Sequence, residues 1–386
     1  MNLNAPWESE ECFPEKPATS DFGYLERSKL VPCTREELIE RCAGLKRPEI
    51  ELVWHSDAPR LVPVWTVGFL GNALLIREKT VLKQNRRVAA FNVLILFVFW
   101  ALAHGQKGSV VLVVFFGLFF GVLPLYQSWR DLRRIDHVKW DTTTAATSFD
   151  RYAAWVETRS DTMTRLLLGI ITLVGILQVV AGYRLRPHGA GIEMPSIMLA
   201  GLIKESVRHG EWWRLFTAPL LHGSLVHFIF NATALFGLGR LTEALAGRSR
   251  LAMVFALSAL GGSLFSQLAM PNTASVGASG GLLGLIGFLM LLGYRRKALL
   301  PPGFLKVFVL NVALVAVMGI AARSIVDNAA HFGGFAAGVA IAAFTVPRQG
   351  GLPVSDTRTS NISGILSFGS ILGFALVAAG KMFGKF

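Results

Sequence analysis

The sequence predicts an all-α protein that crosses a membrane several times. Hydrophobic residues make up 52% of the 386 residues, charged residues only 16%, and the mean hydropathy is +0.49. Soluble globular domains carry about 25% charged residues, and a helix needs about 20 mainly apolar residues to cross a bilayer. We count nine such runs in the chain: 88–104, 109–126, 166–182, 219–238, 251–269, 280–293, 304–320, 325–346 and 362–380.

The positive charge of the chain predicts its orientation and one partner. The net charge is +13, and the basic residues lie in short loops beside apolar runs, as Arg248 and Arg250 do before the run at 251–269 and Arg295 and Arg296 do after the run at 280–293. Cytoplasmic loops of membrane proteins collect Lys and Arg in this way. We therefore expect these loops and the N-terminus to be cytoplasmic and the lipid bilayer to be a partner. No folded basic domain is visible, so nucleic acid is not an expected partner.

The order of these features divides the chain into five expected parts. They are a cytoplasmic region (1–87), a transmembrane hairpin (88–127), a juxtamembrane linker (128–163), a helical core (164–346) and a tail with an extra span (347–386). Trp140 and Trp155 in the linker are expected at the membrane interface. The acidic start of the chain resembles neither a signal peptide nor a transit peptide, which favours a bacterial cytoplasmic membrane.

A small folded module is expected within the N-terminal region. Thr34 and Glu37 form a capping-box pattern, Gly44 suits the end of a short helix, and residues 50–54 alternate as a half-buried strand would. The three cysteines, Cys12, Cys33 and Cys42, also fall here without a metal-ligand pattern, so we expect free thiols.

Polar residues enter the run at 219–238. His222, His227 and Asn231 stand among Leu and Phe, and polar side chains inside a bilayer must face protein or water. His227 and Asn231 are four residues apart and share a helix face, whereas His222 is expected at the mouth of the helix. These residues serve either hydrogen bonding between helices or a functional site. The preceding loop, 183–217, carries Trp213 and Arg214, which suit the headgroup depth.

A serine opens the run at 280–293. In Gly277-Ala278-Ser279-Gly280, Ser279 lies where the backbone turns into a helix, and the first amides of a helix are free to stabilise negative charge. A serine that attacks a carbonyl here has its own amide available for the oxyanion. The alternative is a helix-packing face, since Gly280, Gly284 and Gly287 form a stripe of small residues.

A histidine opens the run at 325–346. His331 lies near the small-residue face formed by Gly334 and Gly338, and a base across a close helix contact could activate Ser279. Asp327, one turn earlier, could orient the histidine ring as a third member, but the favoured interpretation is that Asp327 or Asn328 caps the helix. The runs that begin near 219, 280 and 325 should cross the membrane in the same direction, so His227, Ser279 and His331 should lie at similar depths.

Together these motifs resemble the rhomboid family of intramembrane serine proteases. The resemblance covers roughly 166–346 and rests on Trp213-Arg214, on His222, His227 and Asn231, on Gly277-Ala278-Ser279-Gly280 and on Ala330-His331 with Gly334 and Gly338. It implies a rhomboid-like six-helix core plus a C-terminal seventh helix, here preceded by an N-terminal transmembrane hairpin.

The resemblance also implies the chemistry. Ser279 would be the nucleophile and His331 the general base of a dyad, with His227, Asn231 and the Ser279 amide as the oxyanion hole. Three residues would support the site: His222, Gly277 and Arg214. No metal or organic cofactor is implied, and the substrates would be the transmembrane segments of other proteins.

One departure and two alternatives accompany this interpretation. An aromatic residue commonly stands four positions after the nucleophile in the family, and here that position is Leu283. A catalytically weak or inactive rhomboid-like protein that binds membrane clients would share the fold, but such proteins typically lose the serine or the histidine. A transporter that uses intramembrane histidines would need carboxylates at mid-membrane, which the core runs lack.

Overall fold

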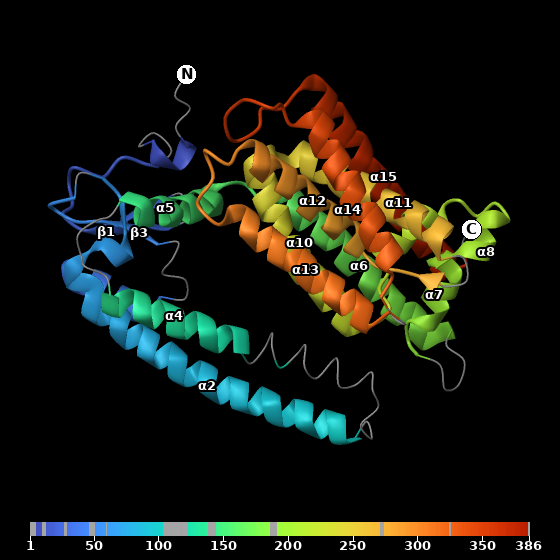
Figure 1. Cartoon of the computed structure of the whole chain (residues 1–386), viewed down its shortest axis with the longest axis horizontal. Helices are drawn as coiled ribbons and strands as arrows, with labels where there is room; N and C mark the ends of the chain where they lie inside the picture. Colours follow the sequence, from blue (N-terminus) through green and yellow to red (C-terminus); the bar gives the residue numbers. More distant parts are fainter. Residues whose placement is uncertain are drawn as a thin grey trace. The chain divides into compact units, whose positions relative to one another are not determined.

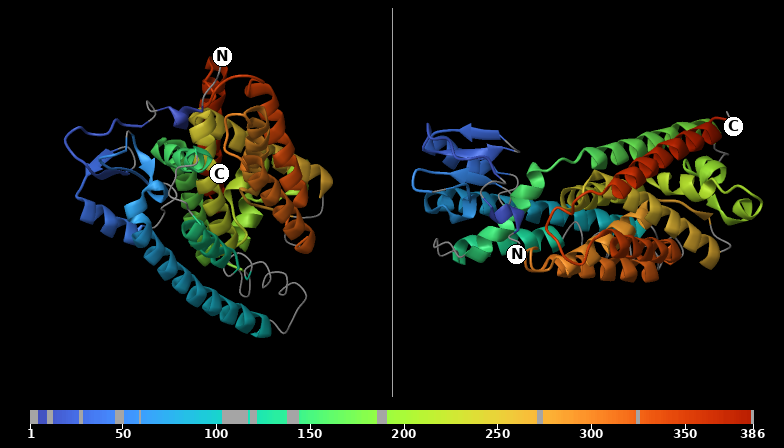
Figure 2. Two further views of the ribbon diagram at one scale, coloured as in Figure 1. Left: turned by 60° about the vertical axis from the view of Figure 1, so that its left-hand side comes forward. Right: turned by 90° about the horizontal axis from the view of Figure 1, so that it is seen from above.

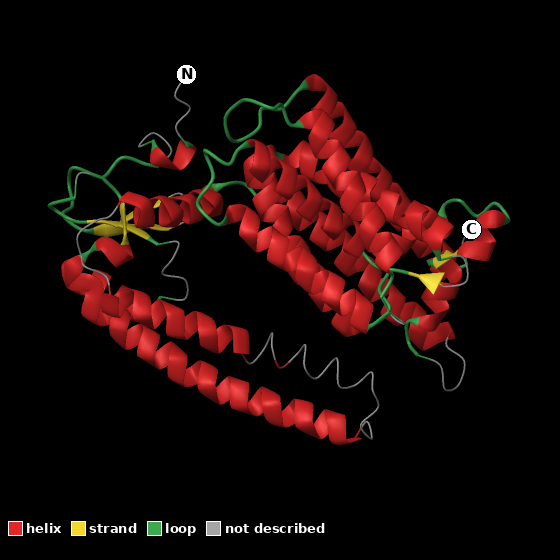
Figure 3. Cartoon of the chain, in the orientation of Figure 1, coloured by secondary structure: helices red, strands yellow, loops and turns green. Residues whose placement is uncertain are grey.

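The computed structural model describes residues 5–9, 13–26, 29–45, 51–58, 60–102, 117, 122–137, 144–185, 191–270, 274–323 and 326–384. The chain divides into two compact units. The N-terminal unit runs to Thr158, and the C-terminal unit comprises Arg159–Phe386. Helices dominate both units, and a small sheet lies in the first (Figure 3).

The N-terminal unit is built on a four-stranded antiparallel sheet with the order β2-β1-β3-β4. Its strands are β1 (Gly23–Glu26), β2 (Lys29–Pro32), β3 (Leu52–Trp54) and β4 (Val62–Pro63), and its short 3-10 helices are η1 (Pro6–Glu8), η4 (Val64–Thr66) and η5 (Gly68–Leu70). The predicted strand near 52–54 is confirmed, but its predicted half-burial is wrong. All three residues of β3 are fully buried, because this strand lies inside the sheet with both faces covered.

Helix α1 (Arg35–Gly44) confirms the capping-box prediction. The Thr34 amide donates to the Glu37 carboxylate at 2.8 Å, and the Glu37 amide donates to the Thr34 hydroxyl at 3.2 Å. The inner face of α1 buries Leu38 and Cys42 in the core of the unit. Cys33 and Cys42 are free thiols, as expected, and Cys12 lies outside the described residues.

Helix α5 (Thr144–Thr158) corrects the prediction for Trp155. The Trp155 side chain is buried, and its ring centroid lies 5.4 Å from that of Trp7. On the same helix, the Arg151 guanidinium donates to the Trp7 carbonyl at 2.8 Å. Trp155 is therefore a core residue of the N-terminal unit and not a membrane-interface anchor. Trp140 lies outside the described residues.

Two further helices of this unit, α2 (Gly71–Leu102) and α4 (Leu123–His137), pack side by side (Figure 1). The Asn85 amide donates to the Ser128 hydroxyl between them. Helix α2 runs without a break through residue 88, where the first predicted span begins, and it exposes apolar side chains such as Phe91 and Phe97. The second predicted span, 109–126, lies largely outside the described residues.

The C-terminal unit confirms a polytopic helical fold. Five described helices are long and apolar enough to cross a membrane: α6 (Thr162–Leu185), α10 (Leu225–Ala246), α11 (Arg248–Ala269), α13 (Phe304–Ala321) and α15 (Arg358–Met382). They correspond to the predicted runs at 166, 219, 251, 304 and 362. The run at 280 forms α12 (Ser279–Arg295), which is apolar but has only 17 residues, and the run at 325 forms α14 (Asn328–Thr345), whose first turn contains Asn328 and His331.

Helices α11, α12 and α14 pack closely against one another, and α15 (red) packs beside α6 (green) and α11 (Figure 2). Most of α12 is buried. The predicted small-residue face is confirmed, since a Cβ on Gly334 would lie 2.0 Å from the Gly280 carbonyl oxygen and one on Gly287 would lie 2.5 Å from the Phe335 carbonyl oxygen. This close approach brings the first turns of α12 and α14 together.

A structured loop connects α6 to α10. It contains α7 (Met194–Ala200), β5 (Leu202–Ile203), α8 (Lys204–Arg208), α9 (Arg214–Thr217) and η7 (Ala218–Leu220). Strand β5 pairs with β6 (Ala274–Ser275), the short strand that precedes α12, with Leu202 opposite Ser275. The loop is therefore anchored four residues before Ser279.

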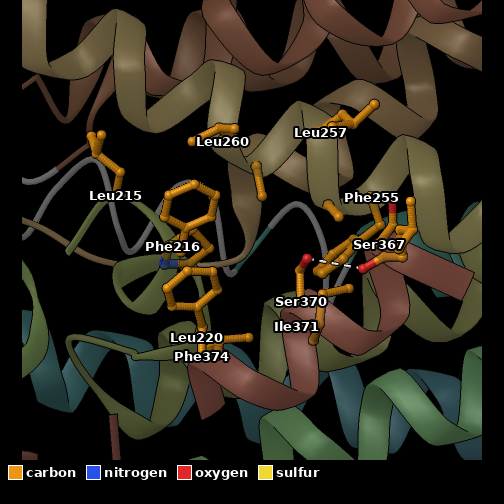
Figure 4. Close-up of a pocket in the computed structure, with 14 residues that line it drawn as sticks. Leu215, Phe216, Leu220, Phe255, Leu257, Leu260, Ser367, Ser370, Ile371 and Phe374 are labelled. Carbon is orange, nitrogen blue, oxygen red and sulfur yellow. Dashed lines mark hydrogen bonds between the residues drawn. The ribbon is translucent and has the colours of Figure 1, made fainter. Parts of the chain in front are cut away.

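An apolar pocket lies between this loop, α11 and α15 (Figure 4). Its volume is about 200 Å³, and Phe216 stacks on Phe374 at its edge with ring centroids 4.3 Å apart. Its lining contains none of the residues that the sequence motifs single out.

Candidate active site

Ser279 and His331 face each other across the contact between α12 and α14. Ser279 is the first residue of α12, and His331 lies in the first turn of α14. The distance from His331 Nε2 to Ser279 Oγ is 2.9 Å, although the two residues are 52 positions apart in the sequence. A hydroxyl and a basic nitrogen within hydrogen-bond reach form the arrangement that activates a nucleophile.

Asp327 caps the helix that carries His331. Its carboxylate accepts a hydrogen bond from the Ala330 amide at 2.9 Å, and its backbone carbonyl accepts one from the His331 amide at 3.1 Å. The prediction that it caps α14 is confirmed. Within the described part of the chain, Nδ1 of the His331 ring has no hydrogen-bond partner. The geometry is thus that of a pair, without a carboxylate on the second ring nitrogen.

His227 and Asn231 lie beside the turn that leads into Ser279. The turn passes through Gly277, whose φ of +127° disfavours any residue with a side chain. A Cβ on Gly277 would meet His227 Cε1 at 2.6 Å and Asn231 Nδ2 at 3.8 Å. Asn231 Nδ2 is buried and has no partner among the described residues, so this donor is available to a ligand.

His222 lies before α10, as its spacing from His227 predicted. Helix α10 begins at Leu225, and its cap Ser224 accepts a hydrogen bond from the His227 amide at 3.1 Å. The His222 ring is 3% exposed and packs edge-on against the His227 ring, with centroids 5.3 Å apart. Neither ring nitrogen of His222 has a partner among the residues described.

Gln178 of α6 holds the backbone of His222, and the sequence analysis did not identify it. Its side-chain carbonyl accepts a hydrogen bond from the His222 amide at 2.9 Å, and its amide donates to the His222 carbonyl at 3.2 Å and to Ser196 Oγ at 2.9 Å. The signal was present in the sequence, because an amide side chain inside the apolar run at 166–182 must face protein.

Arg214 organises the loop between α6 and α10. It is 6% exposed, and its guanidinium donates to the carbonyls of Met198 at 3.1 Å and Gly201 at 2.8 Å. It also stacks over the Trp213 ring at 4.7 Å. These contacts tie Arg214 to the loop, so the supporting role predicted for it stays a prediction that would act through the loop.

Leu283 is buried one turn after Ser279. The structure records no aromatic ring against His331 among the described residues. The departure noted in the sequence therefore has no aromatic substitute from another described element.

Comparison with known proteins shows which protein domain contains these residues. The profile of the Rhomboid domain matches residues 209–348, which contain all of the predicted site residues. The chain is 29% identical to the rhomboid protease GluP of Bacillus subtilis over 179 residues, which cover 45% of this chain and 34% of that protein. It is 29% identical over 144 residues to the putative rhomboid protease YdcA of the same organism, with 37% of this chain and 72% of YdcA covered.

A plant relative is also similar. The chain is 36% identical over 141 residues to RHOMBOID-like protein 6, mitochondrial, of Arabidopsis thaliana, covering 35% of this chain and 44% of that protein. The matches thus span about a third of GluP and under half of the plant protein. Because relatives come from different membranes, the bacterial location stays a prediction. The helical polytopic fold, the matched domain and the named relatives show that this chain is a multi-pass membrane protein that carries a rhomboid domain at residues 209–348.

Proposed function

We propose that this chain is an intramembrane serine endopeptidase that hydrolyses peptide bonds in or near transmembrane segments of other membrane proteins. The observation that carries the proposal is the 2.9 Å distance between His331 Nε2 and Ser279 Oγ at the start of α12. The rhomboid family, typically made of serine proteases, supports the same class of activity.

The chemistry follows from these two side chains. Ser279 Oγ attacks the scissile carbonyl carbon while His331 Nε2 takes the hydroxyl proton. When the C–N bond breaks, His331 returns the proton to the leaving amine and an acyl-enzyme on Ser279 remains. His331 then deprotonates a water molecule, which attacks the ester, releases the carboxylic acid product and restores the serine.

The negative charge that develops on the carbonyl oxygen needs hydrogen-bond donors. Because Ser279 is the first residue of α12, its amide has no partner within the helix. His227 and Asn231 lie against the Gly277 turn beside it, and Asn231 Nδ2 is an unpaired buried donor among the described residues. We assign the oxyanion hole to these three groups. One such donor contributes about 10²–10³ in rate in a serine protease.

The scissile bond must leave its helix before it reacts. A helical backbone shields its carbonyls by hydrogen bonding, so substrates should unwind easily near the cleavage site. Because α10, α12 and α14 begin on the side opposite the Arg-rich loops, cleavage should occur near the outer end of the substrate segment.

The test uses the full chain in detergent and a fluorophosphonate probe, which forms a covalent bond with an activated serine. Mass spectrometry should locate the adduct on Ser279, and both Ser279→Ala and His331→Ala should abolish it. His209→Ala is the matched control, because that histidine is exposed and directly follows α8. Absence of labelling in folded wild-type protein would refute the protease proposal and favour the alternative, an inactive rhomboid-like protein that binds membrane clients.

A further inference from the structure

An ion pair between a buried lysine and a half-buried aspartate lies next to the candidate active site and outside the family motifs described above. Lys204 Nζ is 3.9 Å from Asp327 Oδ2, and the two side chains are 1% and 19% exposed. The Lys204 ammonium also donates to the Ser275 hydroxyl, and the hydroxyls of Ser275 and Ser266 both donate to Asp327 Oδ2. These four residues are the Lys204–Asp327 cluster.

The cluster joins the segments that carry Ser279 and His331. Ser275 lies in β6, four residues before Ser279, and Asp327 is the cap of α14, four residues before His331. Lys204 begins α8 directly after β5, which pairs with β6, and Gln267 of α11 donates to the Lys204 carbonyl at 3.1 Å. A movement of Lys204 would therefore be transmitted to both members of the pair.

Charge explains why a lysine is needed at this position. A carboxylate largely removed from water is costly unless a cation and hydrogen bonds compensate it. Within the part of the chain that the structure describes, Lys204 is the cation paired with Asp327. Without it, the carboxylate would take up a proton or turn toward water. Either change weakens the hydrogen bond that the Asp327 carboxylate accepts from the Ala330 amide. Ala330 is adjacent to His331.

We propose that Lys204 is a positioning residue for the Ser279–His331 pair, acting through Asp327 and Ser275. Its ammonium group holds the strand before Ser279 and the first turn of α14 in a fixed position relative to each other. This inference rests on the proposed function, because it takes Ser279 and His331 as the reacting pair.

The experiment measures fluorophosphonate labelling of Ser279 as a function of probe concentration in the full chain. Lys204→Met should lower the limiting labelling rate about tenfold while the half-saturating probe concentration stays within twofold, because the geometry of the pair changes and the probe site does not. Ser275→Ala removes only one hydroxyl of the cluster and should lower the limiting rate severalfold. Lys297→Met, at an exposed lysine in the loop between α12 and α13, is the matched control and should label as the wild type does.

A double variant separates positioning from general damage. If Lys204 acts through Asp327, the two substitutions should not be additive. Ser279 should then be labelled in the double variant Lys204→Met, Asp327→Asn no more slowly than in the slower of the two single variants. Wild-type labelling in both Lys204→Met and Ser275→Ala, or a loss in the double variant equal to the product of the single losses, would overturn the inference.

Hydrogen exchange keeps this test separate from that of the proposed function. If the wild type itself is unlabelled, the protease proposal fails, yet the cluster still predicts protected amides at Ala330 and His331. Exchange at these amides should be about tenfold faster in Lys204→Met and in Ser275→Ala than in the wild type. Unchanged exchange in both variants would refute the positioning role.

Discussion

Gly338 of α14 lies directly against the backbone of Gly284 in α12. A Cβ atom on Gly338 would come within 1.9 Å of the Gly284 carbonyl oxygen and 2.6 Å of its Cα. No rotamer change relieves such a clash, because the obstacle is backbone. The glycine pair therefore sets the distance between the two helices whose first turns hold Ser279 and His331.

Gly338→Ala should move these helices apart and break the hydrogen bond between Ser279 and His331. Overpacking of this kind costs about 1–3 kcal/mol, and we expect a lower midpoint of thermal unfolding with a loss of Ser279 labelling of at least tenfold. Gly373→Ala in α15 is the control, since a Cβ there meets nothing within 4 Å. Alanine favours a helix over glycine by about 1 kcal/mol, so this control should be unimpaired. Normal labelling and stability in Gly338→Ala would show that the contact is looser than described.

Cys42 of the N-terminal unit should be inert in the folded protein. Burial raises the pKa of its thiol to about 12, and the side chain is fully buried. The reactive species is the thiolate, so at pH 8 iodoacetamide should modify the half-buried Cys33 before Cys42. Peptide mass spectrometry over time gives both rates. In denaturant both should react readily, whereas equal rates in the folded protein would contradict the burial of Cys42.

The sequence predicts the helices of the C-terminal unit well because their signals are local. Length and hydropathy mark α6, α11 and α15 without reference to any neighbour. The pairing of Ser279 with His331 was also accessible, since each polar residue opens an apolar run and the alternation of spans places them at one depth. Their catalytic roles stay a prediction.

Contacts between residues far apart in the sequence were not predicted. Gln178 was missed, because it lies 44 positions from His222 and nothing local in either segment predicts that they meet. The sequence analysis did not single out Lys204, whose side chain is 1% exposed because it follows β5 and lies against Asp327. The wrong prediction for Trp155 has the same origin, because Trp7, which packs against it, lies far from it in the sequence.

Gln178→Leu should damage the site from a distance. The variant leaves the His222 amide and carbonyl without their buried partner, and an unsatisfied buried group costs about 1–3 kcal/mol. The segment before α10 should then shift, and with it His227, which the Ser224 cap positions. We expect Ser279 labelling to fall by about tenfold or more. Gln178→Glu retains the acceptor for the His222 amide, so Ser279 labelling should fall less in this variant.

The lipid-facing variant Thr172→Val serves as its control, because Thr172 is an exposed polar residue of the same helix. It should label as the wild type does. Equal labelling in Gln178→Leu and Thr172→Val would show that the Gln178 clamp does not contribute to the site.

The rate of Ser279 labelling should fall as the pH rises through about 8. Burial lowers the pKa of Lys204 from its ordinary 10.5 to about 8, against the opposing attraction of Asp327. Glu205 and Arg208 on the same short helix are 62% and 46% exposed and pair with each other. In the folded protein the ammonium charge is therefore lost near pH 8, and Asp327 loses its counter-charge.

The pH dependence of stability distinguishes this loss of labelling from a loss caused by unfolding. Between about pH 8 and 10.5 the unfolded chain binds more protons at Lys204 than the folded chain does, so this group makes stability rise with pH in that window. Labelling and the Lys204 contribution to stability should thus change in opposite directions. Labelling rates measured from pH 6.5 to about 9.5 should decline above pH 8 in the wild type and stay flat and low in Lys204→Met. A wild-type rate that stays level or rises through this range would mean that the charge of Lys204 does not hold the pair.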